Sequence, residues 1–175
     1  MRRGAVPVVL ALGAALLLSA CGGGGPANNR IARAPRDPPP EGPINVQLVQ
    51  DTCIPPAERP RPARELPPDR QVAIRDCVNR ETARQYNELL PLRVGQHTVM
   101  DEVSVAGTAL VFHYTVSSRR SELPPEFSRQ VTATARAEAC ADAGFRAMAS
   151  IGGGQTYRFA DRDGLPITDV SVYSC

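Results

Sequence analysis

Two adjacent carboxylates, Asp101 and Glu102, are the first candidates for chemistry in this sequence. A glycosidase needs two carboxyl groups that flank one glycosidic bond. Both residues, however, belong to an alternating run at 98–106 that predicts a β-strand, and neighbouring strand residues point to opposite faces. The pair therefore does not predict a glycosidase, and we expect a bulge or an edge position here instead.

The run Asp161-Arg162-Asp163-Gly164 begins like a calcium-binding loop. Such a loop also needs an oxygen ligand at its fifth position and a Glu at its twelfth. Leu165 and Val172 occupy those two positions. The sequence therefore predicts a tight turn here and no calcium site.

No set of residues for nucleophilic catalysis stands out. The chain has no G-x-S-x-G motif, and its two histidines, His97 and His113, lie in or beside predicted strands without a zinc-binding spacing. All twenty basic residues are Arg, and the absence of Lys excludes Schiff-base chemistry and a Walker-type phosphate site. We therefore expect no enzymatic activity, no metal and no cofactor.

The first cysteine, Cys21, follows a leader that is typical of export. Met1-Arg2-Arg3 precedes a short apolar run, residues 5–18, that is too short for a comfortable membrane span. The motif Leu18-Ser19-Ala20-Cys21 resembles the lipobox of bacterial lipoproteins. That resemblance implies cleavage before Cys21 and its modification by a diacylglyceryl group, with acyl chains such as palmitate. Two or three such chains anchor a protein to a membrane permanently.

The residue after the cysteine is Gly22. In the sorting pattern of Gram-negative lipoproteins, an Asp at this place favours retention in the inner membrane. Its absence implies an outer-membrane lipoprotein that faces the periplasm. In a Gram-positive cell, the same anchor would lie on the outer face of the single membrane.

The other four cysteines, Cys53, Cys77, Cys140 and Cys175, are an even number in an exported chain, which predicts two disulfides. Three pairings are possible. We favour Cys53–Cys77 with Cys140–Cys175, because the first bond would pin the end of a tether to a helix and the second would fasten the terminal strand to another helix.

The 175 residues allow one domain plus attachments. We expect a signal peptide at 1–20, a lipidated Gly/Pro-rich tether at 21–68 and a periplasmic domain at 69–175. Twelve of the seventeen prolines and no aromatic residue lie between residues 26 and 68, which predicts an extended spacer. The apolar alternation at 44–49 is the exception, and it predicts a short strand or a segment that docks on the domain.

Hydrophobic periodicity in the domain predicts a helix at about 70–89 with Asp69 as its N-cap, and a second helix from about residue 124 to 143, ended by Gly144. Two hairpins are expected, one from strands 98–106 and 109–116 and the other from strands 155–160 and 166–174. The predicted fold is α+β: a four-stranded antiparallel sheet of two hairpins with helices packed on one face, in the order α-ββ-α-ββ and stapled by disulfides.

The C-terminal half also carries a resemblance. Its features are Cys140 at a helix end, Phe145-Arg146-Ala147-Met148, a glycine cluster, Tyr157-Arg158-Phe159 and a final Cys175. This arrangement, over residues 89–175, is similar to a group of small exported bacterial proteins without an assigned activity. The resemblance implies the fold and export, and it implies no enzymatic function.

The net charge of +2 includes two arginines of the leader, so the mature chain is nearly neutral and no nucleic-acid partner is expected. Arginine and tyrosine are common in protein-binding hot spots. The candidate partner-binding residues are therefore Arg119, Arg120, Tyr157, Arg158 and Arg162, although isolated arginines are often only solvated charges.

Together these features predict a membrane-anchored lipoprotein that serves as a non-catalytic binding or structural module for an envelope protein complex. The alternative is an envelope inhibitor or immunity-type protein. Such a protein would block a hydrolase or toxin by inserting the turn at Arg119–Leu123 or at Asp161–Gly164.

Overall fold

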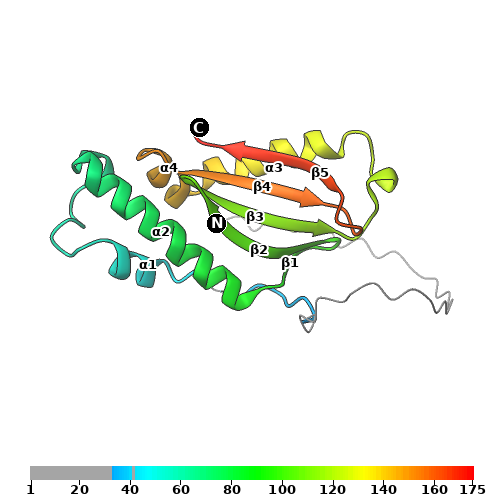
Figure 1. The fold of residues 1–175 in the computed structure, drawn as a ribbon, viewed down its shortest axis with the longest axis horizontal. Helices are drawn as coiled ribbons and strands as arrows, with labels where there is room; N and C mark the ends of the chain where they lie inside the picture. Colours follow the sequence, from blue (N-terminus) through cyan, green and yellow to red (C-terminus); the bar gives the residue numbers. More distant parts are fainter. Residues whose placement is uncertain (1–32, 41) are drawn as a thin grey trace, which may run out of the picture. The chain divides into compact units, whose positions relative to one another are not determined.

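The computed structural model describes residues 33–40 and 42–175, and Arg33–Cys175 form one folded unit (Figure 1). The predicted signal peptide, the lipidation site Cys21 and the first part of the predicted tether lie outside the described residues. Among the described residues, no helix combines the length and the apolar character needed to cross a membrane.

A five-stranded sheet in the order β1-β2-β3-β4-β5 forms the centre of the unit. Its strands are β1 (Leu92–Gly95), β2 (Thr98–Ala106), β3 (Ala109–Val116), β4 (Gly154–Ala160) and β5 (Pro166–Val172). The two predicted hairpins are confirmed as β2–β3 and β4–β5. The prediction of four antiparallel strands is wrong in two respects, because the sheet has a fifth strand and its β3–β4 pair is parallel.

Both differences have a physical cause. The connection from β3 to β4 runs through two helices, which return the chain to the end of the sheet where β3 began, so β4 enters in the same direction. β1 has only four residues and just one buried side chain, Leu92, so it carries no alternation that predicts a strand. It becomes a strand because it pairs with the start of β2.

The long helix α2 (Pro68–Leu89) confirms the predicted helix at about 70–89. Its start differs from the prediction, because Pro67 occupies the N-cap position and no side chain caps the helix. Pro68 instead takes the first helical position, where the missing N–H costs no intrahelical hydrogen bond. Asp69 therefore lies in the first turn, where its charge suits the helix dipole.

The second predicted helix, at about 124–143, is confirmed as α3 (Phe127–Ala141), and a separate short helix, α4 (Ala143–Ala149), follows it. The break occurs at Asp142, whose carboxylate accepts a hydrogen bond from the Phe145 N–H at 2.5 Å and so caps α4. Gly144 lies inside α4 and does not end the helix, contrary to the prediction. Gly152, with a φ of +78°, follows α4 as part of the expected glycine cluster.

The segment at 44–49 docks on the domain, but it does so as part of a helix, α1 (Val46–Cys53), and not as a strand. Asn45 caps this helix by accepting a hydrogen bond from the Leu48 N–H at 2.9 Å. Val49 and Cys53, four residues apart, are its buried residues, as one face of a helix requires. The folded unit therefore starts earlier than residue 69.

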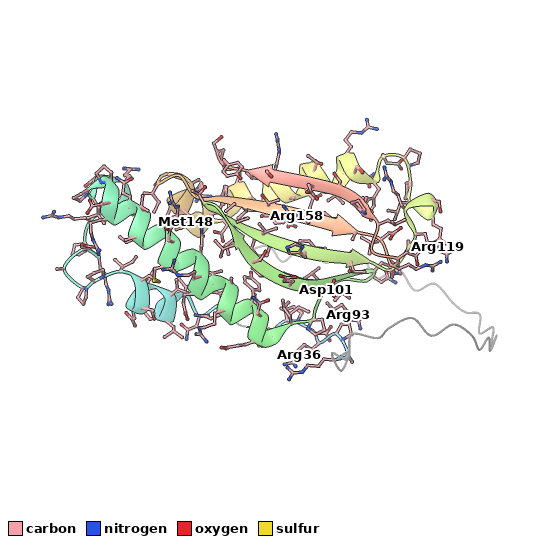
Figure 2. All side chains as sticks on the ribbon, in the orientation of Figure 1. Arg36, Arg93, Asp101, Arg119, Met148 and Arg158 are labelled. Atoms are coloured by element: carbon pink, nitrogen blue, oxygen red, sulfur yellow. A yellow bond between two sulfur atoms is a disulfide. The ribbon has the colours of Figure 1, made fainter. Side chains whose placement is uncertain are left out.

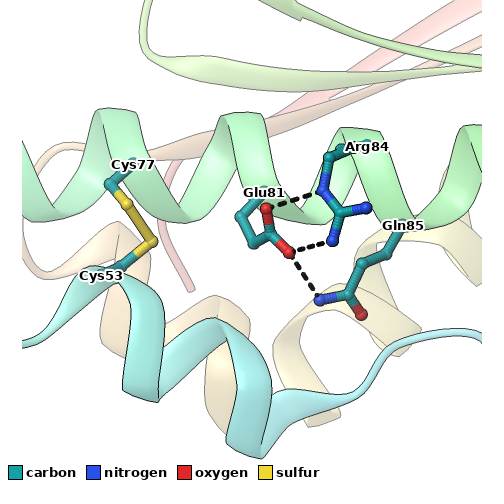
Figure 3. The surroundings of a disulfide bond; sticks show 5 residues. All are labelled: Cys53, Cys77, Glu81, Arg84 and Gln85. Atoms are coloured by element: carbon teal, nitrogen blue, oxygen red, sulfur yellow. Dashed lines mark hydrogen bonds and ion pairs between the residues drawn. A yellow bond between two sulfur atoms is a disulfide. The ribbon is translucent and has the colours of Figure 1, made fainter.

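A disulfide and a hydrogen-bond chain hold α1 against α2 (Figure 3). Gln85 accepts a hydrogen bond from the Asn45 N–H at 2.8 Å and donates one to the Glu81 carboxylate at 3.0 Å. Glu81 in turn binds the guanidinium of Arg84. These hydrogen bonds, with Arg84 the main contributor and Gln85 second, lower the pKa of Glu81 to about 2.

β1 pairs only with the start of β2, and further along the same edge of β2 the helix α2 provides hydrogen-bond partners. The Asn87 side chain donates to the Val103 carbonyl at 2.6 Å and accepts from the Val103 N–H at 3.1 Å. About two turns earlier in α2, the buried Asn79 donates to the Thr108 carbonyl at 3.1 Å. Two amide side chains thus fix the position of α2 along the β2–β3 hairpin.

The start of the folded unit pairs with the outer edge of β1. Arg36 donates its N–H to the Pro91 carbonyl at 3.1 Å, and its carbonyl accepts from the Arg93 N–H at 2.8 Å. This parallel bridge covers the beginning of β1. It cannot extend in the same pattern, because Pro38 has no N–H to donate.

Candidate binding groove

Aromatic side chains from β3 and β4 form a row on the face of the sheet that the helices cover, which we call the inner face. Strand alternation places Phe112 and Tyr114 of β3 on the same face as Tyr157 and Phe159 of β4. Phe112 stacks on Tyr157 with ring centroids 5.5 Å apart, and Tyr114 stacks on Phe159 at 4.8 Å. Tyr86 of α2 meets Phe112 edge to face at 5.5 Å.

The helices do not cover this row completely. Helix α2 packs mainly on β2, whereas α3 runs along β5 (Figure 1). The uncovered part of the inner face is a groove of about 380 Å³ with Tyr114, Tyr157 and Phe159 in its lining. The rest of the lining comes from Val94, Gly95 and Thr98 on one side and from Phe127, Gln130, Val131, Thr134, Ala135 and Glu138 of α3 on the other.

The α3 side of the groove is one face of a helix. Its six residues fall in successive turns at 127, 130–131, 134–135 and 138, so their side chains follow one another along the helix surface. Small residues lie on the side that faces the sheet, where Ala135 and Ala139 are buried against Val170 and Val172 of β5. Because the alanines are small, α3 packs directly on β5, which is the strand with which it makes its main contacts.

Tyr114 and Tyr157, the two tyrosines of the groove, keep their hydroxyl protons at neutral pH. Burial raises the pKa of Tyr114 well above its ordinary value. Burial, followed by the nearby Glu138 carboxylate, raises the pKa of Tyr157 to about 12. The Tyr157 hydroxyl donates to Gln155 at 2.5 Å, whereas the Tyr114 hydroxyl has no hydrogen-bond partner among the described residues. The groove therefore offers aromatic surface and an uncommitted hydroxyl.

Glu138 is the one charged residue among the described residues that line the groove. Its side chain is exposed, and it forms no ion pair or hydrogen bond with another described side chain. The groove is thus apolar at its base and negatively charged at one place on its rim.

The residues predicted to bind a partner do not form one surface. Tyr157 lies in the groove, whereas its neighbour Arg158 points to the opposite, open face of the sheet and pairs with Asp169 at 3.5 Å (Figure 2). Arg119 lies at the end of the sheet that is far from Met148 (Figure 2). Arg120, the next residue, and Arg162 are close to it, because Arg120 binds Asp161 and Arg162 binds Glu122. The five residues therefore lie in three separate places.

Those three arginines lock two turns together. Arg119 pairs with Asp163 at 3.0 Å, and Arg162 pairs with Glu122 at 3.2 Å, which joins the short helix η2 (Arg120–Glu122) to the β4–β5 turn. Asp161 lies beneath them, with only 1% of its surface exposed.

The carboxylate of Asp161 fixes the shape of the β4–β5 turn through hydrogen bonds to the backbone. It accepts the N–H of Arg120 at 3.0 Å, of Asp163 at 3.0 Å and of Leu165 at 2.9 Å. These bonds, that from Arg120 foremost, lower the pKa of Asp161 below its ordinary value. The carboxylate oxygens that a cation would need are thus committed to the backbone, and the predicted turn is confirmed.

The carboxylates and histidines that the sequence offered for catalysis do not come together in one site either. The expected bulge is present in β2 between Met100 and Glu102, and it contains Asp101. His113 lies 3.2 Å from the Ser104 hydroxyl, and His97 lies 3.4 Å from the Ser117 hydroxyl. In the part of the chain that the structure describes, no three metal-ligating side chains lie close enough together to hold an ion.

The groove was not predicted from the sequence. Within each strand the aromatics lie two residues apart and so on one face, Phe112 with Tyr114 and Tyr157 with Phe159, but only the parallel register of β3 and β4 brings the two pairs together. Glu138 carried no signal of its own, because a glutamate in an Ala-rich helix is ordinary. The face of α3 that contains Glu138 can be recognised as a wall of the groove only when the strands opposite it are known.

Both disulfides in the structure match the pairing favoured from the sequence. Cys53 is bonded to Cys77, and Cys140 is bonded to Cys175, with Cα atoms 5.5 and 5.6 Å apart. The second bond attaches the end of α3, and therefore one wall of the groove, to the end of the chain.

No protein-family model matches the chain, and no curated protein sequence matches it. Among solved structures, a Pseudomonas aeruginosa protein described as secreted is 18% identical, with a TM-score of 0.49 over 54% of this chain and 84% of that one. The pilotin EpsS of the Vibrio vulnificus type 2 secretion system is 17% identical, with a TM-score of 0.46 over 51% and 79%. The type II secretion system pilotin AspS of Vibrio cholerae is 18% identical, with a TM-score of 0.42 over 51% and 80%. At these values, the function of this chain has to be inferred from its own residues.

Proposed function

We propose that this protein is a non-catalytic lipoprotein of the bacterial cell envelope, and that its folded unit binds an apolar segment of an envelope protein in the groove beside α3. The observation that supports the binding role is the uncovered aromatic row of Tyr114, Tyr157 and Phe159. All three rings are partly exposed, and covering the rest of their surface with an apolar side chain is favourable because it removes that surface from water. The proposed role is compatible with the two pilotins, but it rests on the groove and not on that likeness.

The groove has the features of a binding site for part of a protein chain. Its base is apolar, its rim carries the polar side chains of Gln130 and Thr134, and the Tyr114 hydroxyl is free to bind a backbone carbonyl or N–H. A few fixed polar groups around an apolar base are typical of sites that recognise a particular orientation of the ligand.

A pair of variants on α3 tests this role. Thr134 and Ala133 are adjacent and exposed, but only Thr134 lines the groove. Thr134→Trp should fill the groove and Ala133→Trp should leave it open, while both should retain the circular dichroism of the wild type. An envelope partner is first identified by pull-down with the wild-type chain and then purified, and its binding is measured directly. We expect Ala133→Trp to bind it as the wild type does and Thr134→Trp to lose binding; equal binding by both variants would refute the groove.

The anchoring part of the proposal concerns Cys21. The lipobox resemblance and the following Gly22 support lipidation and an outer-membrane location. In Cys21→Ser the lipid should be absent from the N-terminus by mass spectrometry, and the protein should leave the membrane fraction. A Cys21→Ser protein that still fractionates with the outer membrane and carries as much lipid as the wild type would contradict this part.

The inhibitor alternative is favoured by one observation, the two locked turns at residues 117–123 and 161–165. Ion pairs and the buried Asp161 fix their shape before any partner arrives, which lowers the entropy lost on binding. If the purified partner is a hydrolase whose activity falls on binding, and if Leu165→Asp abolishes that effect while Thr134→Trp does not, the alternative is correct.

A further inference from the structure

We propose that the segment bound in the groove carries a basic side chain that pairs with Glu138, so that this residue selects a cation among otherwise apolar ligand groups. The inference rests on the proposed function of the groove and adds to it the chemistry of the partner.

A negative charge at Glu138 does not stabilise α3. The residue is in the last turn of the helix, which ends at Ala141, and the negative end of the helix dipole disfavours a carboxylate there. The cation at this end, Arg146, donates to the Cys140 and Ala141 carbonyls and forms no ion pair with Glu138. The residues three and four positions away are Thr134, Ala135, Ala141 and the C-cap residue Asp142, and none is basic. The helix therefore provides no internal ion pair for this carboxylate.

The surroundings of Glu138 in the groove do not neutralise it either. The other described residues of the lining are apolar or uncharged, and Arg136 lies two residues away, which directs it to another side of the helix. An unpaired carboxylate that is unfavourable for its own helix and borders an apolar groove is the kind of local inconsistency expected at a functional site.

The rest of the groove lining is compatible with the same kind of ligand. A guanidinium or ammonium group that reaches Glu138 would lie beside Tyr114 and Tyr157, which line the same groove. The Tyr114 hydroxyl could accept a hydrogen bond from such a group. The carboxylate would attract the cation, whereas an anionic ligand group would be repelled.

Three synthetic peptides test the inference with the full-length chain. Each is an amphipathic peptide of Leu and Ala with one Trp, and the three differ only in a central Arg, citrulline or Glu. Because the wild-type chain has no Trp, the fluorescence of the peptide Trp reports binding without background in the wild type and in the Glu138 and Glu126 variants. Binding to Thr134→Trp, which carries its own Trp, is measured by calorimetry. Citrulline keeps the shape of Arg and removes its charge, so the comparison isolates the ionic contribution.

We expect the wild type to bind the Arg peptide about fivefold more tightly than the citrulline peptide, as for an exposed ion pair of about 1 kcal/mol. The preference should decrease with salt. Glu138→Gln should abolish it, Glu138→Arg should reverse it in favour of the Glu peptide, and Glu126→Gln, an exposed carboxylate outside the groove lining, should leave it unchanged.

The outcomes separate the two proposals. If the peptides bind the wild type with equal affinity and Thr134→Trp blocks them, the groove binds peptides but the role of Glu138 is refuted. If none of the peptides binds, or if Thr134→Trp does not affect binding, the proposed function of the groove is itself refuted.

Discussion

Cys140 in α3 and Cys175 at the end of the chain are joined by a disulfide that crosses the edge of the sheet. The ring of Tyr173 lies over Gly154 on the open face, whereas α3 packs on the inner face, so the last three residues pass from one face to the other. This covalent connection supplements the small apolar contacts of Ala135 and Ala139 with β5.

Removal of this bond by Cys140→Ser with Cys175→Ser should lower the free energy of unfolding by about 4 kcal/mol, because the bond closes a loop of 35 residues in the unfolded chain. The β4–β5 hairpin and α3 should show faster hydrogen exchange than the β2–β3 hairpin. The Cys53→Ser, Cys77→Ser variant is the control, and it should instead loosen α1. Equal acceleration in both hairpins would contradict the local role of the Cys140–Cys175 bond.

Asn87→Ala should expose the part of β2 that β1 does not cover. The substitution removes both hydrogen bonds to the Val103 backbone, so it should lower stability by about 1 kcal/mol and accelerate exchange of the Val103 N–H. Urea unfolding and hydrogen exchange measure the two effects. The neighbouring exposed residue provides the control, since Glu88→Ala should leave the Val103 exchange rate unchanged; protection of Val103 in Asn87→Ala would show that the amide is dispensable.

Glu81 should make the contact between α1 and α2 sensitive to acid. Its pKa falls from 4.5 to about 2 in the folded protein, so its stabilising contribution is complete above pH 4.5 and is lost as the pH falls towards 2. Glu81→Gln should reduce the change in urea midpoint over this pH range. In Arg84→Gln, the carboxyl titration of Glu81 observed by NMR should move upward towards 4.5; an unchanged titration would exclude Arg84 as the main cause.

Gly153→Ala should be destabilising. A Cβ at this position would lie 2.9 Å from the Met148 carbonyl oxygen, a backbone atom that can move only if α4 moves. We expect a loss of about 1–3 kcal/mol in urea unfolding, as for other overpacked sites. Gly95→Ala is the matched control, because its nearest contact would be an ordinary 3.7 Å. A similar stability of the two variants would show that the end of α4 adjusts freely.

The elements with a strong local pattern were predictable from the sequence. The alternation of residues 98–106 and 109–116 defined β2 and β3, and the apolar periodicity before Pro91 defined α2, because each pattern depends on residues close together in the chain. The order of the elements also favoured the cysteine pairing found in the structure, since it placed Cys140 and Cys175 on adjoining elements.

Tertiary structure alone decided the parallel β3–β4 pair, the fifth strand and the helical form of residues 46–53. Each depends on partners that are distant in sequence: β1 on β2, α1 on α2, and β4 on the path of α3 and α4. The groove also depends on residues that are distant in the sequence. Tyr114, Glu138 and Phe159 come from three elements, and the space between them is the part of the inner face that α2 and α3 leave uncovered. No local pattern encodes such a space, because its size depends on all the contacts that position the two helices on the sheet.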